Sequence, residues 1–468
     1  MSTRMTMIPA EIFRKYDIRG DADGDQAVIT PEVARLVGRA FGTYLRRADQ
    51  TAVVVGHDNR LTSEALAAAA IDGLQASGLN VIDIGLAATP VLYWHAVQRG
   101  HIGGLMITGS HLTPDKNGFK LGIGVRSLYG DQITALRTLI EADDFIGGDG
   151  SGVTVPDARQ QYLDDLAGRI TMQRQLKVVI DAGNGIGGLF GPQLVSAWGH
   201  DVVACLFCEP DGRYPNHQPD PQKAKNVRDL SAAVVGHRAD VGLAFDGDAD
   251  RVGVVDDQGN LIAPDRVLTL LARDLLARHP GAKVIADVSS SQVVFDTIAA
   301  AGGEAIMWLT GHSFVKAKLI ETGALLAGEM SGHIFLAEDY PGFDDGFFAA
   351  GRLLQLIANS DQPLSALDAS IPRLHSTPVY RPHCPPHLMH PALERIQTAL
   401  AAEGEITAID GVRIKFANGW GGIRASNTEP VLSMRFEAAT EADALAYRDQ
   451  FVAVLRAFPE IDLSDIDC

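Results

Sequence analysis

Three aspartates at alternating positions form the clearest chemical signal in this sequence. Asp246, Asp248 and Asp250 follow the apolar segment 241–245, and Arg251 comes directly after them. Carboxylates on a turn that leaves a strand can direct their oxygens at one small, hard cation. Because neighbouring anions repel one another without such a cation, a divalent ion is favoured over a solvated acidic turn. Mg²⁺ fits best, since three protein oxygens leave coordination positions for phosphate or water.

A serine lies in a second polar loop, which follows an apolar segment. The loop reads Thr-Gly-Ser-His-Leu-Thr-Pro-Asp-Lys over 108–116, and we expect Ser110 to be accessible at a strand-to-loop turn. His111 and Lys120 could offset the charge of a group that the serine carries. The G-x-S-x-G pattern of serine hydrolases is not met, because Leu112 replaces the second glycine. A phosphate carried on Ser110 beside the aspartate-bound metal would explain both loops, whereas the serine loop alone could equally be an ordinary turn.

Two glycine-bounded loops supply groups suited to a phosphorylated sugar. In the first, Glu329 can accept hydrogen bonds from two neighbouring sugar hydroxyls, and Ser331 and His333 can add more. The second loop follows three closely spaced glycines and combines a guanidinium, hydroxyls and exposed backbone N–H groups, a set that suits a phosphate dianion. Its candidate residues are Arg424, Ser426, Asn427 and Thr428.

A competing signal is the sequence Gly-Asn-Gly-Ile-Gly-Gly at 183–188, which matches the G-x-G-x-x-G pattern of dinucleotide-binding folds. Glu209 lies near the position expected for a ribose-binding acid. An NAD-dependent dehydrogenase is therefore a second hypothesis. The related turns near Gly56 and Ser289 lack the pattern, however, so close packing of a strand-to-helix turn is the favoured interpretation.

Composition excludes several classes of protein. The chain has 468 residues, is 46% hydrophobic and carries a formal net charge of −18, which fits a globular protein and disfavours nucleic acid as a partner. The charged first twenty residues lack the apolar core of a signal peptide, and no apolar run reaches the ~18 residues of a membrane span. We therefore expect a cytoplasmic protein that binds no membrane. The four cysteines imply no disulfide framework, and Cys205 and Cys208 are expected to be reduced thiols.

The scaffold that must position these loops repeats along the chain. Three segments each follow the pattern strand, helix, strand, with a glycine where the helix ends. The predicted units are 51–55, 63–76 and 80–84; 177–180, 191–198 and 201–206; and 283–286, 292–301 and 304–308. Such alternation predicts α/β layers whose strands are largely parallel.

The pattern changes beyond residue 370. Frequent prolines over 372–391 indicate a linker and an irregular strand. We expect helices at 391–403 and 441–458, strands at 405–409, 412–416 and 431–437, and a glycine-rich loop before the last strand. The predicted fold class is three related mixed α/β domains plus a smaller C-terminal α+β domain. The expected domains are 1–150, 151–257, 258–370 and 371–468, which contain the serine, aspartate, Glu329 and Arg424 loops respectively.

The four loops in this order, together with Phe-Arg-Lys-Tyr-Asp-Ile-Arg-Gly at 13–20, resemble the bacterial phosphomannomutase/phosphoglucomutases of the α-D-phosphohexomutase superfamily over nearly the whole chain. The resemblance implies four domains around a central cleft. It also implies a role for each loop. Ser110 would be the phosphoserine and would bind the metal ion together with Asp246, Asp248 and Asp250, and Arg251 would lie beside the transferring phosphoryl group. The sugar hydroxyls would be bound by Glu329, Ser331 and His333, and the second phosphate by Arg424, Ser426, Asn427 and Thr428. Tyr16, Arg19, Lys120 and His312 match further active-site positions.

The activity implied by this resemblance is the interconversion of hexose 1-phosphate and hexose 6-phosphate, with mannose, glucose or both as the sugar. It would proceed through a phosphoserine enzyme, Mg²⁺ and a hexose 1,6-bisphosphate. Lys120 and His333 are candidates for moving the hydroxyl proton, with His312 a weaker one. We expect small sugar phosphates as partners and a monomer or weak dimer. Phosphoglucosamine mutase is the nearest alternative, although Met330 favours the mannose/glucose branch, and a non-catalytic sugar-phosphate binder is another.

Two positions depart from the family pattern. Leu112 and Thr113 stand where the family usually has Asn-Pro, which puts the shape of the serine loop in doubt. Ser289 stands where a lysine is often found, which removes a candidate substrate contact.

Overall fold

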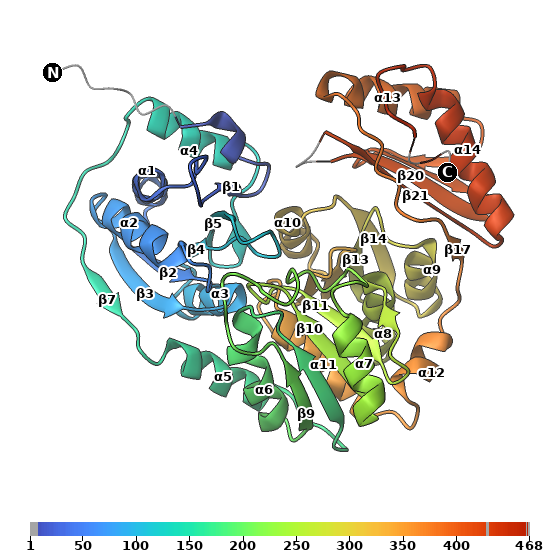
Figure 1. Ribbon diagram of the computed structural model, residues 1–468, viewed down its shortest axis with the longest axis horizontal. Helices are drawn as coiled ribbons and strands as arrows, with labels where there is room; N and C mark the ends of the chain where they lie inside the picture. The colour runs from blue at the N-terminus through green and yellow to red at the C-terminus, as the bar shows by residue number, and fades with distance from the viewer. Residues whose placement is uncertain (1–7, 427–429, 465, 467–468) are drawn as a thin grey trace.

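The computed structural model describes residues 8–426, 430–464 and 466, and this part of the chain forms four sheets. Figure 1 shows four successive units, from the blue N-terminal unit on the left to the red C-terminal unit at the upper right. Within the same residues, no helix is both long enough and apolar enough to cross a membrane.

The first unit is a mixed sheet covered by helices, with the strand order β1-β5-β4-β2-β3-β7 and with β6 beside β5. Its strands are β1 (Ile18–Asp21), β2 (Ala52–His57), β3 (Asn80–Leu86), β4 (Gly103–Ile107), β5 (Lys116–Ile123), β6 (Arg126–Ser127) and β7 (Gly152–Thr154). Its helices are α1 (Pro31–Arg47), α2 (Ser63–Gln75), α3 (Thr89–Gln98) and α4 (Asp131–Glu141), after a short 3₁₀ turn, η1 (Ala10–Ile12). Strands β3, β2 and β4 are parallel, and β5 returns antiparallel to β4.

The second unit repeats this arrangement, with the strand order β12-β11-β10-β8-β9. Its strands are β8 (Lys177–Asp181), β9 (Asp201–Leu206), β10 (Val241–Phe245), β11 (Val252–Asp256) and β12 (Leu261–Ile262). Its helices are α5 (Ala158–Arg169), α6 (Gly191–Ala197) and α7 (Arg228–His237), with the 3₁₀ turn η2 (Ile186–Leu189). Strands β9, β8 and β10 are parallel, and β11 returns antiparallel.

The third unit has the strand order β14-β13-β15-β16. Its strands are β13 (Lys283–Asp287), β14 (Glu304–Trp308), β15 (Leu326–Gly328) and β16 (Ile334–Leu336). Its helices are α8 (Pro264–Arg278), α9 (Gln292–Ala300), α10 (His312–Thr322), α11 (Gly346–Ala358) and α12 (Leu364–Ala369). Strands β14, β13 and β15 are parallel, and β16 returns antiparallel to β15.

The fourth unit is an antiparallel sheet in the order β17-β21-β20-β19-β18. Its strands are β17 (His375–Ser376), β18 (Glu405–Thr407), β19 (Val412–Phe416), β20 (Gly419–Ala425) and β21 (Leu432–Ala438), and its helices are α13 (Pro386–Ala399) and α14 (Glu441–Leu455). Three related mixed α/β units followed by a smaller antiparallel unit confirm the predicted fold class.

The three strand–helix–strand repeats are confirmed, whereas two details of the C-terminal unit are wrong. The expected glycine-rich loop is strand β20, because β19 and β21 pair with it on both sides and supply its backbone hydrogen bonds. The helix expected from residue 391 begins at Pro386, since proline fits the first turn of a helix, where no backbone N–H is needed.

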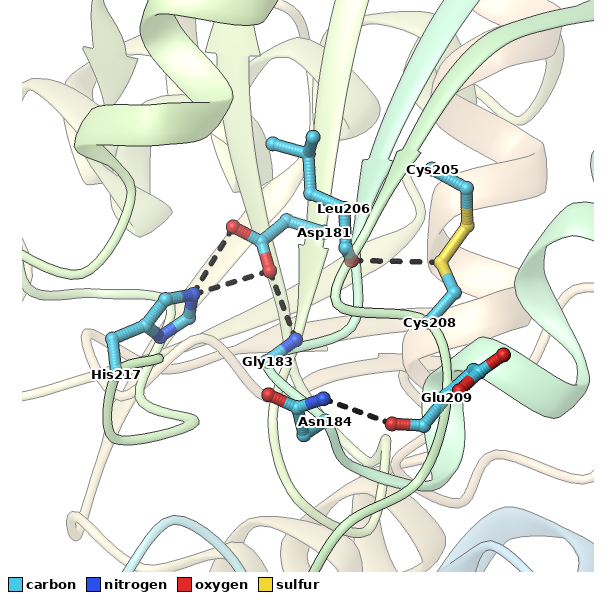
Figure 2. The surroundings of a disulfide bond; sticks show 8 residues. All are labelled: Asp181, Gly183, Asn184, Cys205, Leu206, Cys208, Glu209 and His217. Atoms are coloured by element: carbon cyan, nitrogen blue, oxygen red, sulfur yellow. Dashed lines mark hydrogen bonds and ion pairs between the residues drawn. A yellow bond between two sulfur atoms is a disulfide. The ribbon is translucent and has the colours of Figure 1, made fainter. Parts of the chain in front are cut away.

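The prediction of reduced thiols is also wrong, because Cys205 and Cys208 form a disulfide. The chain turns after β9 at Phe207, whose φ is +49°, and this turn brings the two Cα atoms to 5.9 Å, within the disulfide range. The sequence pattern C-x-x-C by itself does not predict this turn of the backbone. Figure 2 shows the disulfide beside Asn184, whose side chain donates a 2.9 Å hydrogen bond to the carbonyl of Glu209.

Aromatic side chains join the second and third units. Phe347, on α11, packs against Phe245 and Phe190 of the second unit, with ring centroids 4.9 and 5.3 Å apart. All three rings are buried in one hydrophobic core that extends through the first three units, while the fourth unit has a core of its own. The first three units therefore share a common apolar interior.

Replacing Phe347 with alanine should lower the free energy of unfolding by about 3–5 kcal/mol, because the deletion leaves a cavity where two units meet. Denaturant unfolding followed by fluorescence measures the loss. The matched control is Leu61→Ala, at a side chain that is 70% exposed, which should change stability by no more than ~0.5 kcal/mol. Equal effects of the two substitutions would contradict the role of Phe347.

Candidate active site

Ser110 lies in the loop between β4 and β5, where the first unit meets the second. Its Oγ donates a 2.8 Å hydrogen bond to Oδ2 of Asp246 and lies 3.2 Å from Nδ1 of His111. The prediction that the serine is accessible is wrong, because its exposed fraction is 0%. The aspartate loop covers it so closely that a Cβ at Gly247 would lie 2.3 Å from the Ser110 carbonyl oxygen.

Arg60 fixes the shape of the serine loop. Its guanidinium donates to the carbonyl oxygens of Ser110, Leu112 and Lys116 at 2.8, 2.7 and 2.9 Å, and it also donates to the carbonyl of Thr113. The arginine is itself buried, and its charge is paired with Asp58 at 3.3 Å. The residues at 112 and 113 thus take part in this arrangement through their backbone.

The three aspartates converge in a fully buried cluster between β10 and β11. Their carboxylate oxygens lie within 4.8 Å of one another, and all three side chains are buried. Lys120, from β5, places Nζ 2.6 Å from Oδ2 of Asp248 and also contacts Asp250. Thr89, at the start of α3, donates a 2.6 Å hydrogen bond to the same oxygen of Asp248.

The electrostatics of this cluster favour an added cation. Burial, reinforced by Asp248 and Asp250, raises the pKa of Asp246 well above its usual range. Burial opposes ionisation of Asp250 too, but Lys120 and His333 hold its pKa well below the usual value. Oδ1 of Asp248 is buried and accepts no hydrogen bond from any described residue. A buried, unsatisfied oxygen among three carboxylates fits a hard divalent metal ion.

The Glu329 loop, between β15 and β16, meets the aspartate cluster through His333. Nε2 of His333 lies 3.3 Å from Oδ1 of Asp250 and 3.2 Å from Nε of Arg251. On the other side of the ring, Nδ1 lies 2.8 Å from Oγ of Ser331 and 3.2 Å from Oε2 of Glu329. The predicted sugar and metal residues are therefore in direct contact.

The remaining predicted residues of the first and third units lie around this centre. Nη1 of Arg19 donates a 3.4 Å hydrogen bond to the carbonyl of Gly109, beside Ser110. The ring of His312, at the start of α10, lies with its centroid 5.4 Å from that of Tyr16 and 5.4 Å from that of His333. The structure thus brings Tyr16 and His312 together, although nearly 300 positions separate them in the sequence.

A cavity of about 290 Å³ lies between the third and fourth units. Ser331, Met330 and Asp287 line it on one side, and Arg424 and Arg435 on the other. Arg424 is paired with Asp410 at 3.1 Å, and the Ser426 backbone pairs with Val431 just after β20. The predicted residues Asn427 and Thr428 lie outside the described residues.

Ser289 lies in a loop that two arginines of the fourth unit contact. Its carbonyl oxygen accepts a 3.0 Å hydrogen bond from Nη1 of Arg435, which comes from β21 of the fourth unit. Arg413, from β19, donates to the neighbouring carbonyls of Val288 and Ser290 at 2.6 and 2.8 Å. Two arginines therefore reach the loop in which the family lysine is missing.

The glycine-rich turn at 183–188 is filled by protein rather than shaped for a dinucleotide. A Cβ at Gly188 would lie 1.9 Å from the carbonyl oxygen of Cys208, so close packing accounts for this glycine. The turn also supports the aspartate loop, because the N–H of Ile186 donates a 3.1 Å hydrogen bond to the carbonyl of Gly247. This geometry favours the packing interpretation over NAD binding.

Sequence analysis did not identify Arg60, Thr89, Lys316 or Asp344 as part of the site. Arg60 had a detectable signal, since it ends the polar run Asp58-Asn59-Arg60 after strand β2. Asp344 and Lys316 are paired at 2.8 Å behind His312, and neither lies in a motif with a chemical pattern of its own.

Comparison with protein families agrees with this geometry. Domains I, II and III of phosphoglucomutase/phosphomannomutase match residues 10–146, 160–259 and 263–374, and the C-terminal domain of that family matches residues 389–454.

Individual proteins are similar over almost the full length. A phosphoglucomutase of Neisseria meningitidis and a phosphomannomutase/phosphoglucomutase of Pseudomonas aeruginosa are each 44% identical, over 98% of this chain and 99% of theirs. A crystal structure of a phosphoglucomutase/phosphomannomutase family protein from Burkholderia thailandensis superimposes with a TM-score of 0.90 at 40% identity, covering 96% of this chain and 98% of that one. With all four domains matched in order, this chain belongs to the phosphoglucomutase/phosphomannomutase family.

Proposed function

We propose that the chain is a phosphohexomutase, an intramolecular phosphotransferase that interconverts hexose 1-phosphate and hexose 6-phosphate of mannose, glucose or both. The observation that carries this proposal is the 2.8 Å hydrogen bond from Ser110 to Asp246, two residues separated by 136 positions. This hydrogen bond supports the interpretation that the Ser110 hydroxyl carries phosphate directly beside a carboxylate cluster suited to a metal ion.

The reaction consists of two phosphoryl transfers with Ser110 as the carrier. In the first, the P–O bond to the serine Oγ breaks and a P–O bond to the free sugar hydroxyl forms, while that hydroxyl gives up its proton. The product is a hexose 1,6-bisphosphate, which turns round in the cleft. In the second transfer its other phosphate returns to Ser110, and the oxygen left on the sugar regains a proton. The same bisphosphate can rephosphorylate a serine that has lost its phosphate, and so act as an activator.

Charge neutralisation carries most of the catalysis in phosphoryl transfer. Asp246, Asp248 and Asp250, with an oxygen of the phosphoserine, would hold Mg²⁺, which supplies positive charge next to the transferring group when bound. Arg251 reaches the same position, with Nε 3.7 Å from Oδ2 of Asp246.

We assign the substrate contacts to the two loops that meet at the cavity between the third and fourth units, which Ser331 and Arg424 line. Glu329 and Ser331 would bind sugar hydroxyls, and Arg424 and Ser426 the phosphate that does not react. Asn427 and Thr428 are assigned to that phosphate on the family resemblance alone. Glucose and mannose differ at C2, so a carboxylate that binds other hydroxyls accepts both sugars, and Met330 favours these sugars over glucosamine.

The working unit that we propose is a monomer or weak dimer. Phosphorylated sugars are charged and do not cross membranes unaided, so we propose that the enzyme acts in the cytoplasm on such small molecules.

Replacing Ser110 with alanine should lower the mutase rate at least about 10³-fold, because the covalent carrier is lost. Mass spectrometry of the wild type incubated with glucose 1,6-bisphosphate should place one phosphate on the Ser110 peptide. Ser110→Gly is a second variant, since φ is +50° at this position and glycine accepts that backbone conformation. The control is Thr113→Ala in the same loop, which should keep the phosphate and the activity. Near-normal turnover without a hydroxyl at 110 would refute the proposal.

Asp248→Asn should raise the Mg²⁺ concentration for half-maximal activity at least about tenfold, because an anionic ligand is removed. The measurement is a Mg²⁺ titration of the enzyme after chelation, with Asp257→Asn, an aspartate outside the cluster, as the control. Unchanged metal dependence of Asp248→Asn would contradict the ligand assignment.

Glu329→Gln should lower kcat/KM about 10–100-fold for glucose 1-phosphate and mannose 1-phosphate alike, because charged hydrogen bonds to shared hydroxyls become neutral ones. Coupled assays with both sugars measure the two losses side by side. A loss confined to one sugar would show that Glu329 discriminates between them.

A further inference from the structure

An aspartate stands at the carboxyl end of the central strand in each of the first three units. These residues are Asp58, directly after β2, Asp181, the last residue of β8, and Asp287, the last residue of β13. All three are at most 1% exposed. Burying a carboxylate is unfavourable unless its oxygens are hydrogen-bonded, so the partners of each aspartate must account for its position.

In the first unit this aspartate holds the serine loop. The last paired residues of β2 and β4 are His57 and Ile107, and Asp58 follows His57. Oδ2 of Asp58 accepts a 3.1 Å hydrogen bond from the N–H of Gly109, which lies two residues beyond Ile107 and directly before Ser110. The carboxylate therefore fixes the backbone next to the proposed phosphate carrier.

The third unit repeats this contact in the same register. The last paired residues of β13 and β15 are Ala286 and Gly328, and Asp287 follows Ala286. Oδ1 of Asp287 accepts a 3.3 Å hydrogen bond from the N–H of Met330, which lies two residues beyond Gly328 and directly after Glu329. Asp287 and Met330 both line the cavity between the third and fourth units.

Asp287 joins two further segments to this loop. Its Oδ1 accepts a 2.7 Å hydrogen bond from the hydroxyl of Ser290, and its Oδ2 accepts one of 3.1 Å from the hydroxyl of Thr310. One carboxylate thus connects the loops that follow the three parallel strands β13, β14 and β15.

The contact with Thr310 leads directly to the carboxylate of Glu329. The next residue, Gly311, donates its N–H to Oε1 of Glu329 at 2.5 Å. The other oxygen, Oε2, is buried and accepts no hydrogen bond from any described residue. With Oε1 occupied by the backbone, Oε2 is the oxygen left for a sugar hydroxyl.

Asp287 differs from Asp58 in its charge balance. Two residues after Asp58 the chain has Arg60, which forms an ion pair with it, whereas two residues after Asp287 the chain has the uncharged Ser289. Burial, followed by the charge of Glu329, raises the pKa of Asp287 from 3.8 to about 6. Because the pKa is raised, ionisation of Asp287 lowers the stability of the fold as the pH rises from 3.8 to about 6, and the loss persists at neutral pH. A role in the site explains such a carboxylate better than packing does.

We propose that Asp287 is a positioning residue that fixes the Glu329 loop for sugar binding, as Asp58 fixes the serine loop. The inference deepens the proposed function and rests on it. Asp287 holds the loop at two points, through the N–H of Met330 and, by way of Thr310, through the residue that binds Oε1 of Glu329. The direction in which Glu329 presents Oε2 to the sugar then depends on Asp287, which does not itself need to touch the sugar.

The competing explanation is that Asp287 only closes the turn before α9. Ser290 supplies the contacts for that role, since its N–H donates a 3.0 Å hydrogen bond to the carbonyl of Asp287 and its hydroxyl donates to Oδ1. Ser290→Ala is therefore the matched control, because it removes a hydrogen bond to the same oxygen and leaves Met330 and Thr310 in place.

The first test measures hydrogen–deuterium exchange by mass spectrometry in the full-length enzyme. In Asp287→Ala the peptide that covers 329–333 should exchange at least about tenfold faster than in the wild type, because the N–H of Met330 loses its acceptor. The peptide that covers 108–113 should not change, and Ser290→Ala should leave both peptides at wild-type rates. Unchanged exchange at 329–333, or equal acceleration in both peptides, would overturn the proposal.

The second test is a double-mutant cycle of Asp287→Ala and Glu329→Gln, assayed with glucose 1-phosphate and mannose 1-phosphate. Asp287→Ala should lower kcat/KM about 10–100-fold for both sugars. If it acts through Glu329, the double variant should lie within about twofold of the more impaired single variant, and additive losses would contradict this. Ser290→Ala should change kcat/KM by less than about twofold.

Two conservative variants complete the test. Asp287→Asn keeps an oxygen that can accept from Met330 and should restore kcat/KM to within about fivefold of the wild type, so an Asn variant as impaired as the Ala variant would refute positioning by hydrogen bonds. Thr310→Val removes only the hydroxyl donated to Oδ2, which tests the same contacts if Asp287→Ala does not fold. It should lower kcat/KM about three- to tenfold, and an unchanged value would count against the proposal.

The tests separate this inference from the proposed function. A wild-type enzyme with no mutase activity and no phosphate on Ser110 would refute the proposed function, whereas exchange at 329–333 would still report whether Asp287 holds the loop. An active wild type whose exchange and kcat/KM do not respond to Asp287→Ala would refute only the role of Asp287.

Discussion

The burial of three carboxylates at one point is the constraint on which the rest of this structure depends. Asp246, Asp248 and Asp250 have no exposure to water, so their charges must be balanced by other groups or by a bound ion. The balancing groups come from different units: Lys120 from the first, Arg251 from the second and His333 from the third. Electrostatic balance thus holds three units in a fixed relation, and the shared aromatic core around Phe347 supports the same arrangement.

The three site loops occupy equivalent places in three equivalent sheets. In each sheet, a central strand has a parallel strand on either side. One of these two parallel strands is followed in the sequence by an antiparallel strand, which gives the pairs β4 and β5, β10 and β11, and β15 and β16. The loop between these two strands contains Ser110 in the first unit, the aspartates in the second and Glu329 to His333 in the third. A single loop position in a repeated unit therefore supplies the hydroxyl, the carboxylates and the sugar-binding groups.

Sequence patterns predicted the three repeats and all of these loops, because apolar periodicity and glycine at helix ends are local signals. They did not predict contacts that depend on distant segments. Thr89 reaches Asp248 across 159 positions, and the pairing of Lys316 with Asp344 depends on how α10 packs. The Cys205–Cys208 disulfide depends on a turn at Phe207, and β20 appears as a loop until its two neighbouring strands are known. The burial of Ser110 likewise follows from a second unit that covers it.

Arg60 has a consequence for how this protein can evolve. The Arg60 guanidinium donates hydrogen bonds to main-chain oxygens, so these contacts depend on the path of the loop backbone and not on the side chains of the loop. A substitution at 112 or 113 that keeps the path of the loop leaves these contacts intact, while a change at Arg60 itself would deprive four carbonyls of their donor at once. Selection should accordingly act more strongly on this one arginine than on the neighbours of the reactive serine.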